Sequence, residues 1–280
     1  MDNTKKLELK KTACKVRMGI IEGTFNAKSG HPGGSLSIAD IITYLYFSEM
    51  NVDPKNPQWE DRDRFVLSKG HTAPALYGAL AIKGFFPWDL IKTLRKPDSI
   101  LQGHPSMRYT PGVDMSTGSL GQGISAAVGM ALSGKLRNKS YRVYTPLGDG
   151  EIEEGQVWEA AMFAGNHKLD NLVAIVDYNN LQIDGTLDEV NSPMPIDKKF
   201  EAFGWNVISI NGHCFDEIED AFNKAKQFKG KPTCIVAKTK KGKGVSFMED
   251  QCDWHGSAPN AEQYEKAMDE LNKALAELEA

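Results

Sequence analysis

Short apolar runs alternate along this chain with stretches of helical periodicity, and few folds accommodate that alternation. The apolar runs are the strand candidates Arg64–Leu67, Tyr141–Leu147, Leu172–Asp177, Val207–Ile210 and Thr233–Lys238. Helical candidates lie at 7–27, 37–50, 73–83, 121–136, 155–166 and 215–228, and an amphipathic helix is expected over Asn260–Leu278. Strands separated by helices of ten or more residues form βαβ units, so the sequence predicts an α/β fold, a parallel sheet with helices on both faces.

Nothing in the sequence divides the chain into parts. Its 280 residues are enough to bury a large core, and they contain no internal repeat or low-complexity linker. We therefore expect a single domain over residues 1–280 that ends in the amphipathic helix. Ser35 or Ser37 is the expected N-cap of helix 37–50.

Composition and charge exclude several classes of function. The net charge of −4 gives no general attraction to nucleic acid or to an anionic membrane. The basic run Lys238, Lys240, Lys241 and Lys243 is interpreted as a solvated or site-lining loop. No segment has the apolar core of a signal peptide or the length of a membrane helix, and the four cysteines are scattered. A cytoplasmic protein is expected.

The most informative segment lies where two consecutive strand candidates end. Gly148-Asp149-Gly150 follows the first of them and Tyr178-Asn179-Asn180 follows the second, with thirty positions between Asp149 and Asn179. One right-handed strand–helix–strand crossover fits this spacing and brings both side chains to the sheet edge where parallel sheets bind ligands. Ser68-Lys69-Gly70-His71, after an earlier strand, should reach the same edge.

Asp149 and Asn179 would supply hard oxygen donors, which suit Mg²⁺, Ca²⁺ or Mn²⁺, and a diphosphate could complete the coordination. Gly148 and Gly150 allow close approach of the backbone to phosphate, and the following helix offers free N–H groups. Gly-Asp-Gly alone would equally fit an ordinary strand-to-helix turn. Its pairing with Asn179 is what indicates a metal and diphosphate site.

Four of the six histidines occupy turns bounded by glycine or proline. They are His31 in SGHPGG, His71 in SKGHTAPALY, His104 in LQGHPS and His255 in DWHGSAP. One such histidine would usually be structural, but four indicate a shared polar site that moves protons near neutral pH. His167 and His213 are assigned structural roles, although His213 follows a strand and could also reach the rim.

These motifs occur together, and in this order, in one family. SGHPGG, SKGHTAPALY, GHPS, TGSLGQGIS, the GDG…NN pair and KTKKGKGVSF…WHG resemble the transketolases over residues 10–260. The chain is similar to the amino-terminal, diphosphate-binding half of a transketolase. The resemblance implies the thiamine-diphosphate-binding fold and two cofactors, thiamine diphosphate and a divalent metal such as Mg²⁺.

The resemblance also implies roles for individual residues. Asp149, Asn179 and the main-chain carbonyl of Leu181 would bind the metal. Cofactor contacts would come from His71, Gly118, Ser119, Leu120, Gly150, Asn179 and His255. The catalytic residues facing the two-carbon unit of a ketose donor would be His31, His104 and His255. TGSLGQG, in which Ser119 replaces the proline of many transketolases, is also a glycine-rich helix start. Glu151, Glu153 and Glu154 are expected to cap the next helix or, for Glu154, to cross a subunit interface.

A complete transketolase is more than twice this length. By resemblance, its second half supplies the carboxylate that contacts the aminopyrimidine of the cofactor and the arginines that hold the sugar phosphate. We therefore expect this chain to be inactive alone and to pair with a carboxy-terminal transketolase subunit, as α₂β₂, in carbohydrate metabolism of the pentose-phosphate type. Candidate contact residues for that subunit are Trp158, Met162, Phe163 and Tyr178.

Other functions stay open at this point. The chain could belong to a sugar-specialised transketolase, acting on an unusual or sulfonated ketose, or to a relative of the deoxyxylulose-phosphate synthases. It could also be a non-catalytic module that binds thiamine diphosphate. The histidine set argues against the last of these, because binding diphosphate and metal needs no proton-transfer groups.

Overall fold

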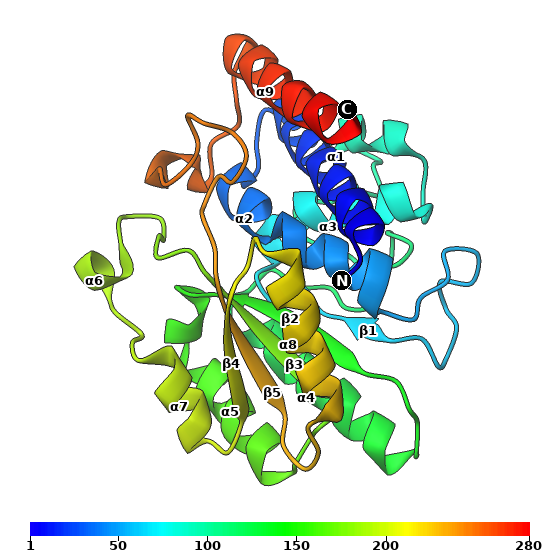
Figure 1. Cartoon of the computed structure of the whole chain (residues 1–280), viewed down its shortest axis with the longest axis vertical. Coiled ribbons are helices and arrows are strands. Elements are labelled where there is room, and N and C mark those ends of the chain that lie inside the picture. The colour runs from blue at the N-terminus through cyan, green and yellow to red at the C-terminus, as the bar shows by residue number, and fades with distance from the viewer.

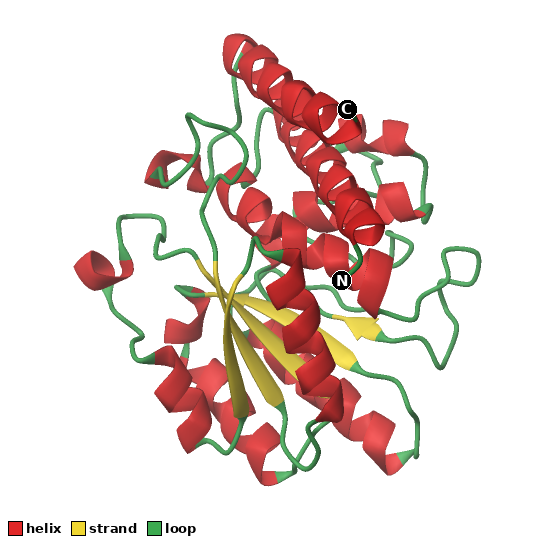
Figure 2. Ribbon diagram, viewed as in Figure 1, coloured by secondary structure: helices red, strands yellow, loops and turns green.

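A five-stranded parallel sheet forms the centre of the computed structural model, which describes residues 1–280 (Figure 1, Figure 2). The strands are β1 (Arg64–Phe65), β2 (Val143–Gly148), β3 (Leu172–Tyr178), β4 (Asn206–Asn211) and β5 (Thr233–Lys238). Their order across the sheet is β1-β2-β3-β5-β4, and every neighbouring pair is parallel. The predicted fold class is confirmed, and all five strand candidates form strands.

Helices cover both faces of the sheet. The core on one face is built with α2 (Pro32–Tyr44) and α8 (Phe215–Gln227), and α1 (Asn3–Ala27), α3 (Ala73–Lys83) and α9 (Ala261–Glu279) pack onto it further from the sheet. The other face carries α4 (Gln122–Leu136), α5 (Gly155–Asn166) and α7 (Ile196–Ala202). Successive residues of β3 alternate between the two cores: Val173 and Ile175 pack with the first group, and Ala174 and Val176 with the second. This alternation is the period of two of a strand that is buried on both sides.

The start of α2 differs from the prediction. The helix begins at Pro32 with His31 as N-cap, and Ser35 and Ser37 are buried within it instead of capping it. Proline at the first helical position fixes φ for the helix and has no N–H to satisfy, so the chain can turn helical directly after His31. The serine hydroxyls bond back into the helix, from Ser35 Oγ to the His31 carbonyl (2.6 Å) and from Ser37 Oγ to the Gly34 carbonyl (2.9 Å).

The two terminal helices lie side by side, away from the sheet (Figure 1). Leu271 of α9 is buried, and its carbonyl accepts a hydrogen bond from Cys14 Sγ of α1 at 3.2 Å. No helix has both the length and the apolar character needed to cross a bilayer. Several helical segments lie outside the predicted helices: α6 (Leu187–Val190), α7, and 3₁₀ segments at Gly70–Thr72, Trp88–Thr93, Glu151–Glu153 and Cys252–His255.

Candidate active site

A pocket of about 270 Å³ opens at the carboxyl ends of β2 and β3, between the sheet and the start of α2. Most of the predicted site residues line it. From the prediction they are His31, His71, Gly118, Leu120, Asp149, Gly150, Asn179, Leu181 and His255; the other lining residues include Gly34, Lys69, Gly148, Glu151, Gln182, Ile183 and Lys241. Seven separate stretches of the chain therefore meet at this edge of the sheet, where parallel sheets bind their ligands.

The three proposed metal ligands lie on adjoining loops of this pocket. Gly148 and Asp177 are partners in the β2–β3 register, which sets Asp149 and Asn179 just beyond neighbouring strand ends. The Asp149 carboxylate accepts hydrogen bonds from the Gly150 N–H (2.9 Å) and the Asn180 N–H (2.6 Å). Asn179 Oδ1 accepts one from the Leu181 N–H at 3.1 Å, which folds the loop back over the pocket.

The Asp149 carboxylate is electrostatically unsatisfied. It is 2 % exposed, and burial together with the nearby Asp177 carboxylate raises its pKa to about 7. A cation beside it would relieve this repulsion. Nowhere in the chain do three His, Cys, Asp or Glu side chains gather to hold a metal ion, so a cation here would also need the amide of Asn179 and the carbonyl of Leu181. These donors are all hard oxygens, so they fit a Mg²⁺-type ion.

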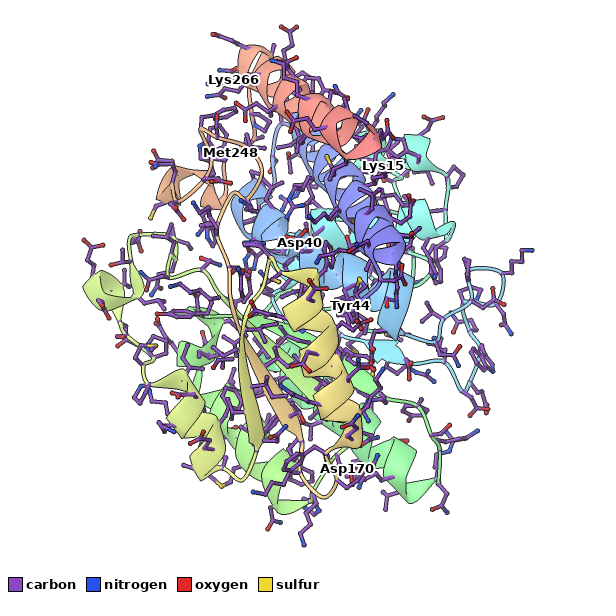
Figure 3. All side chains as sticks on the ribbon, viewed as in Figure 1. Lys15, Asp40, Tyr44, Asp170, Met248 and Lys266 are labelled. Atoms are coloured by element: carbon purple, nitrogen blue, oxygen red, sulfur yellow. The ribbon has the colours of Figure 1, made fainter.

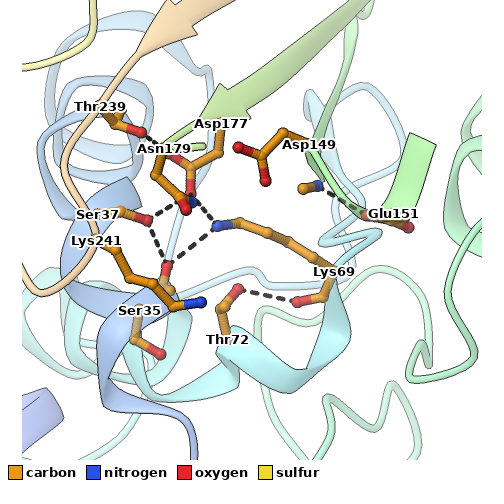
Figure 4. Close-up of polar contacts among 12 residues, drawn as sticks. Ser35, Ser37, Lys69, Thr72, Asp149, Glu151, Asp177, Asn179, Thr239 and Lys241 are labelled. Carbon is orange, nitrogen blue, oxygen red and sulfur yellow. Dashed lines mark hydrogen bonds and ion pairs between the residues drawn. The ribbon is translucent and has the colours of Figure 1, made fainter. Parts of the chain in front are cut away.

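A buried ion pair that the sequence analysis did not single out lies beneath the pocket. The Lys69 ammonium contacts the Asp177 carboxylate, and both side chains are almost fully buried (Figure 4). Asp177 also accepts hydrogen bonds from Ser37 Oγ and Thr239 Oγ1, so it ties α2, β3 and the end of β5 together. Although burial opposes ionisation, Lys69 and these donors hold the Asp177 pKa below its usual value.

Lys241 places a second ammonium group at the pocket wall. It is 1 % exposed, and burial lowers its pKa to about 8. Its Nζ donates to the Leu181 carbonyl (3.1 Å) and lies 3.0 Å from His255 Nδ1. One of the two interpretations of the basic run, a loop that lines a site, thus applies to Lys241, whereas Lys240 and Lys243 form ion pairs with Glu249 outside the pocket.

Three of the four loop histidines form a triangle. The ring centroids of His31, His71 and His255 are 5.1, 5.3 and 5.5 Å apart. Burial, reinforced by nearby positive charge, lowers the pKa of His31 to about 4 and that of His255 to about 3, and moves the pKa of His71 well below its usual value. All three imidazoles are therefore neutral at physiological pH. His31 Nδ1 is buried without a hydrogen-bond partner.

His104 and Ser119 stand apart from the other predicted residues. Neither lines the pocket; the His104 ring lies behind Gly118, where an added Cβ would come within 3.0 Å of it. Arg95, which the sequence analysis passed over, lies near enough to contribute to the lowered pKa values of His31 and His104. Its guanidinium donates to Ser29 Oγ at 3.2 Å.

Glu151 has a different role from the expected one. It is 3 % exposed, and its carboxylate accepts hydrogen bonds from the Gly121 N–H (2.9 Å), the Gly148 N–H (3.0 Å) and Ser68 Oγ. It therefore joins three loops of the pocket instead of capping α5. A buried carboxylate next to an anion site is tolerated when its oxygens accept hydrogen bonds from backbone N–H groups in this way. Glu154 is exposed, as an interface residue requires.

Of the apolar residues expected at a subunit contact, two are exposed and two are not. Met162 and Phe163 are 57 % and 40 % exposed on α5. Trp158 packs on the rings of Phe200 and Phe203, and Tyr178 is half-buried at the end of β3. Trp158 is thus partly buried and packs against the core. His167 packs on Phe163, in keeping with its assigned structural role.

The residues that sequence reasoning missed were partly visible in the motifs already noted. Lys69 stands in SKGH, and Asp177 is the last residue of a strand candidate two positions before Asn179. An ionisable side chain at the end of an apolar strand, next to a ligand-binding turn, was the available signal. Nothing in the sequence distinguished Lys241 from Lys240 and Lys243.

A parallel sheet with a carboxylate and an amide at adjacent strand ends, beside a pocket lined by two buried lysines, is the arrangement expected of a domain that binds a diphosphate through a divalent cation. The family model described as "Transketolase, thiamine diphosphate binding domain" matches residues 9–274. The chain is 50% identical to a 6-deoxy-6-sulfo-D-fructose transketolase subunit from Clostridium sp. (strain MSTE9), over 95% of this chain and 97% of that one. It is 44% identical to an apulose-4-phosphate transketolase subunit from Phocaeicola vulgatus, over 95% and 94% of the two chains.

Among solved structures, transketolase from Campylobacter jejuni superposes with a TM-score of 0.90 at 34% identity, covering 99% of this chain. The match covers 46% of the Campylobacter chain, so this chain spans less than half of that transketolase. The chain therefore belongs to the transketolase thiamine diphosphate binding domain family and is a transketolase subunit of a split enzyme.

Proposed function

We propose that this chain, together with a second polypeptide that carries the other half of a transketolase, transfers a two-carbon ketol unit from a ketose phosphate to an aldose acceptor. One observation supports this above all: the histidine triangle and the Asp149–Asn179 donors share a single pocket. Proton-transfer groups beside a metal and diphosphate site suit ketol transfer and are superfluous for binding alone.

In this proposal the pocket floor holds the cofactor. Asp149, Asn179 and the Leu181 carbonyl bind a divalent cation, and Lys69 and Lys241 are the cationic groups nearest to a diphosphate. Lys69 is already paired with Asp177, so Lys241 supplies the more available positive charge. Thiamine diphosphate provides the nucleophile and the electron sink for ketol transfer.

The histidines are suited to binding and moving protons on substrate oxygens. Because the Lys241 ammonium donates to His255 Nδ1, the ring proton of His255 sits on Nε2 and can be donated to a substrate oxygen. The buried Nδ1 of His31 has no partner within the protein. A substrate hydroxyl would satisfy it, which explains how an unpaired polar atom is tolerated there.

We also propose that residues 1–280 act as one domain in a cytoplasmic α₂β₂ complex of the pentose-phosphate type. The two cores share the strands of one sheet, and all four cysteines are free, which suits a reducing compartment. Two relatives that match along almost their whole length are transketolase subunits, and Met162 and Phe163 offer apolar surface to a partner.

Co-expression with the second polypeptide tests the proposal. We expect the two chains to co-purify and the complex, with thiamine diphosphate and Mg²⁺, to transfer ketol units in a coupled assay, whereas this chain alone should not. Ketol transfer by the isolated chain at the rate of the complex would refute the requirement for a partner. A complex that binds the cofactor but transfers nothing would support the non-catalytic alternative.

A sugar-specialised activity is the second candidate function. It is favoured by two relatives that match along almost their whole length and are named for unusual sugars, 6-deoxy-6-sulfo-D-fructose at 50% identity and apulose-4-phosphate at 44%. Comparing kcat/KM of the complex for fructose 6-phosphate and for 6-deoxy-6-sulfo-D-fructose separates the two. A preference for the sulfonated sugar of tenfold or more, which corresponds to about 1.4 kcal/mol, would establish the specialised function.

A further inference from the structure

We propose that His213, Asp40 and Arg17 form a positioning network that fixes the loop 239–245 and thereby aims the Lys241 ammonium into the cofactor pocket. The inference rests on the proposed function, in which that ammonium faces a diphosphate. None of the three network residues lines the pocket itself, so they act through Lys241.

The network converges on one carboxylate oxygen. Arg17 Nη2 of α1 lies 2.6 Å from Asp40 Oδ2 of α2, and His213 Nδ1, in the turn after β4, lies 2.7 Å from the same oxygen. Asp40 is 5 % exposed, and Arg17 is 8 % exposed. Burial alone would raise the Asp40 pKa, but Arg17 and the His213 hydrogen bond lower it to about 2, so the carboxylate stays charged. Asp40, which is labelled in Figure 3, therefore anchors two side chains from distant parts of the sequence.

Each anchored side chain then binds the backbone on one side of Lys241. The Lys240 N–H donates to His213 Nε2 at 2.9 Å, and Arg17 Nε donates to the Lys243 carbonyl at 3.0 Å. The backbone of Lys241 is thus held from both directions, on a loop that contains two glycines with positive φ, Gly242 and Gly244. Glycines make a loop free to move, so external hydrogen bonds are needed to give it one conformation.

The geometry also fixes the state of His213. A backbone N–H can only donate, so Nε2 must be the acceptor, and the single ring proton of the neutral imidazole is on Nδ1, facing Asp40. Nδ1 therefore donates a hydrogen bond to Asp40 and Nε2 accepts one from Lys240, and a substitution can remove either bond separately. Only the acceptor touches the loop that carries Lys241.

The side chain that this network holds in position is that of Lys241. The side chains of Lys240 and Lys243 point outward to Glu249, whereas Lys241 is buried and turned into the pocket (Figure 4). Its ammonium forms hydrogen bonds only with two carbonyls and an imidazole nitrogen, and no carboxylate lies within ion-pair distance of it. A desolvated cation without an anionic partner needs its backbone held in place.

His213 is also accessible from outside the cofactor pocket. It lines a separate groove of about 720 Å³ beside β4, together with Asn211, Asp197 and Lys240. Removal of the imidazole would therefore leave a space that solution imidazole can enter. The same groove supplies a matched control in Asp197, an acidic residue in the first turn of α7.

Two substitutions separate the tasks of the ring. His213→Gln places an amide oxygen near the position of Nε2 and can still accept from Lys240, whereas His213→Asn can reach Asp40 but not the loop. We expect the two-chain complex with His213→Asn or His213→Ala to bind thiamine diphosphate about tenfold more weakly, the effect of one lost hydrogen bond. Binding by His213→Gln and Asp197→Asn should change less than about threefold, and imidazole should partly restore His213→Ala.

Two further measurements distinguish positioning from general damage. Binding of thiamine, which lacks the diphosphate, should be unchanged in His213→Ala. In a Lys241→Ala background, His213→Ala should have no further effect on the affinity for thiamine diphosphate, because the two residues act as one unit. The network would be overturned if His213→Ala lost equal affinity for thiamine and for thiamine diphosphate. It would also be overturned if His213→Ala had its full effect on affinity in the Lys241→Ala background. Neither result would contradict the proposed ketol transfer. Calorimetry on the assembled complex measures all of these affinities.

Discussion

Asp149 is the residue on which metal binding depends most, because its carboxylate is the only anionic oxygen among the three proposed ligands. We expect Asp149→Asn or Asn179→Ala to abolish metal-dependent retention of thiamine diphosphate while the fold survives. Asp149→Asn places its amide NH₂ against the Gly150 or Asn180 N–H, but it also removes a buried charge close to Asp177, and the two effects should largely offset. Calorimetry with the partner present measures retention, and the exposed Asp184→Asn serves as control. Unchanged affinity in both site variants would contradict the assignment.

The histidine triangle should make stability depend on pH. Burial holds the pKa of His31 near 4 and that of His255 near 3, against about 6.5 in the unfolded chain, so the unfolded state binds more protons below pH 6.5. The histidine contribution to the free energy of unfolding should therefore fall as the pH drops from 6.5 towards 4, by about 1–2 kcal/mol after allowance for solvent screening. Asp149, whose raised pKa makes the folded state bind more protons in this range, acts in the opposite direction, so the comparison with a histidine variant isolates the histidine effect. Denaturant titrations at several pH values measure this, and His255→Gln should flatten the profile. An unchanged slope in that variant would show that His255 is not responsible.

The same histidines are expected to act in turnover more than in cofactor binding. His31→Ala and His255→Ala should lower kcat by about 10²–10⁴, the usual contribution of a positioned proton-transfer group. The affinity for thiamine diphosphate should change far less. His167→Ala, at the end of α5, is the matched histidine control. Parallel losses of turnover and affinity would assign both residues to holding the cofactor.

At the scale of secondary-structure elements, Glu151 joins the loops that follow β1 and β2 to the start of α4. Its carboxylate satisfies the N–H groups of Gly121 and Gly148 and the hydroxyl of Ser68. Glu151→Ala would leave these buried donors unpaired and should lower the free energy of unfolding by about 3 kcal/mol. Thermal unfolding checks this against Glu159→Ala, an exposed position on α5. Equal stability of Glu151→Ala and Glu159→Ala would show that the hydrogen bonds of Glu151 are not required for stability.

The helices and strands themselves were largely predictable from the sequence. Strands β2 to β5 fall within two residues of their expected bounds because each is a short apolar run between polar turns. The prediction was too long at β1, where Phe65 is the last residue in the ladder although Val66 and Ser68 still donate to β2 carbonyls. It placed the start of α2 too late, since Pro32 and two glycines resemble a break, whereas proline is favourable at the first helical position.

At the scale of the whole molecule, an apolar face between α4 and α5 remains without a partner in this chain. Val128, Leu132 and Ala160 line a shallow groove there with Phe163, and Met162 is exposed beside them. Phe163→Asp should weaken association with the second polypeptide by tenfold or more, because an aromatic anchor is replaced by a charge. Analytical ultracentrifugation measures association, and Phe228→Asp, exposed at the end of α8, is the control. Equal association of both variants would place the interface elsewhere.

Local information in the sequence determined the class of fold, the edge of the sheet that binds ligands and part of the pocket lining, whereas Gly118, Leu120 and Leu181 were assigned by resemblance to the transketolases. Periodicity reports which side chains are buried, and glycine, proline and histidine in turns mark the loops, so both features can be read from a few neighbouring residues. Only the tertiary structure decided how distant charges pair. Lys69 with Asp177, and Arg17 and His213 on Asp40, are contacts between residues 23 to 173 positions apart. The proposed positioning of Lys241 in the pocket depends on the contacts with Asp40. Such pairs form because a buried charge must find a partner in three dimensions, and no local pattern records which partner that is.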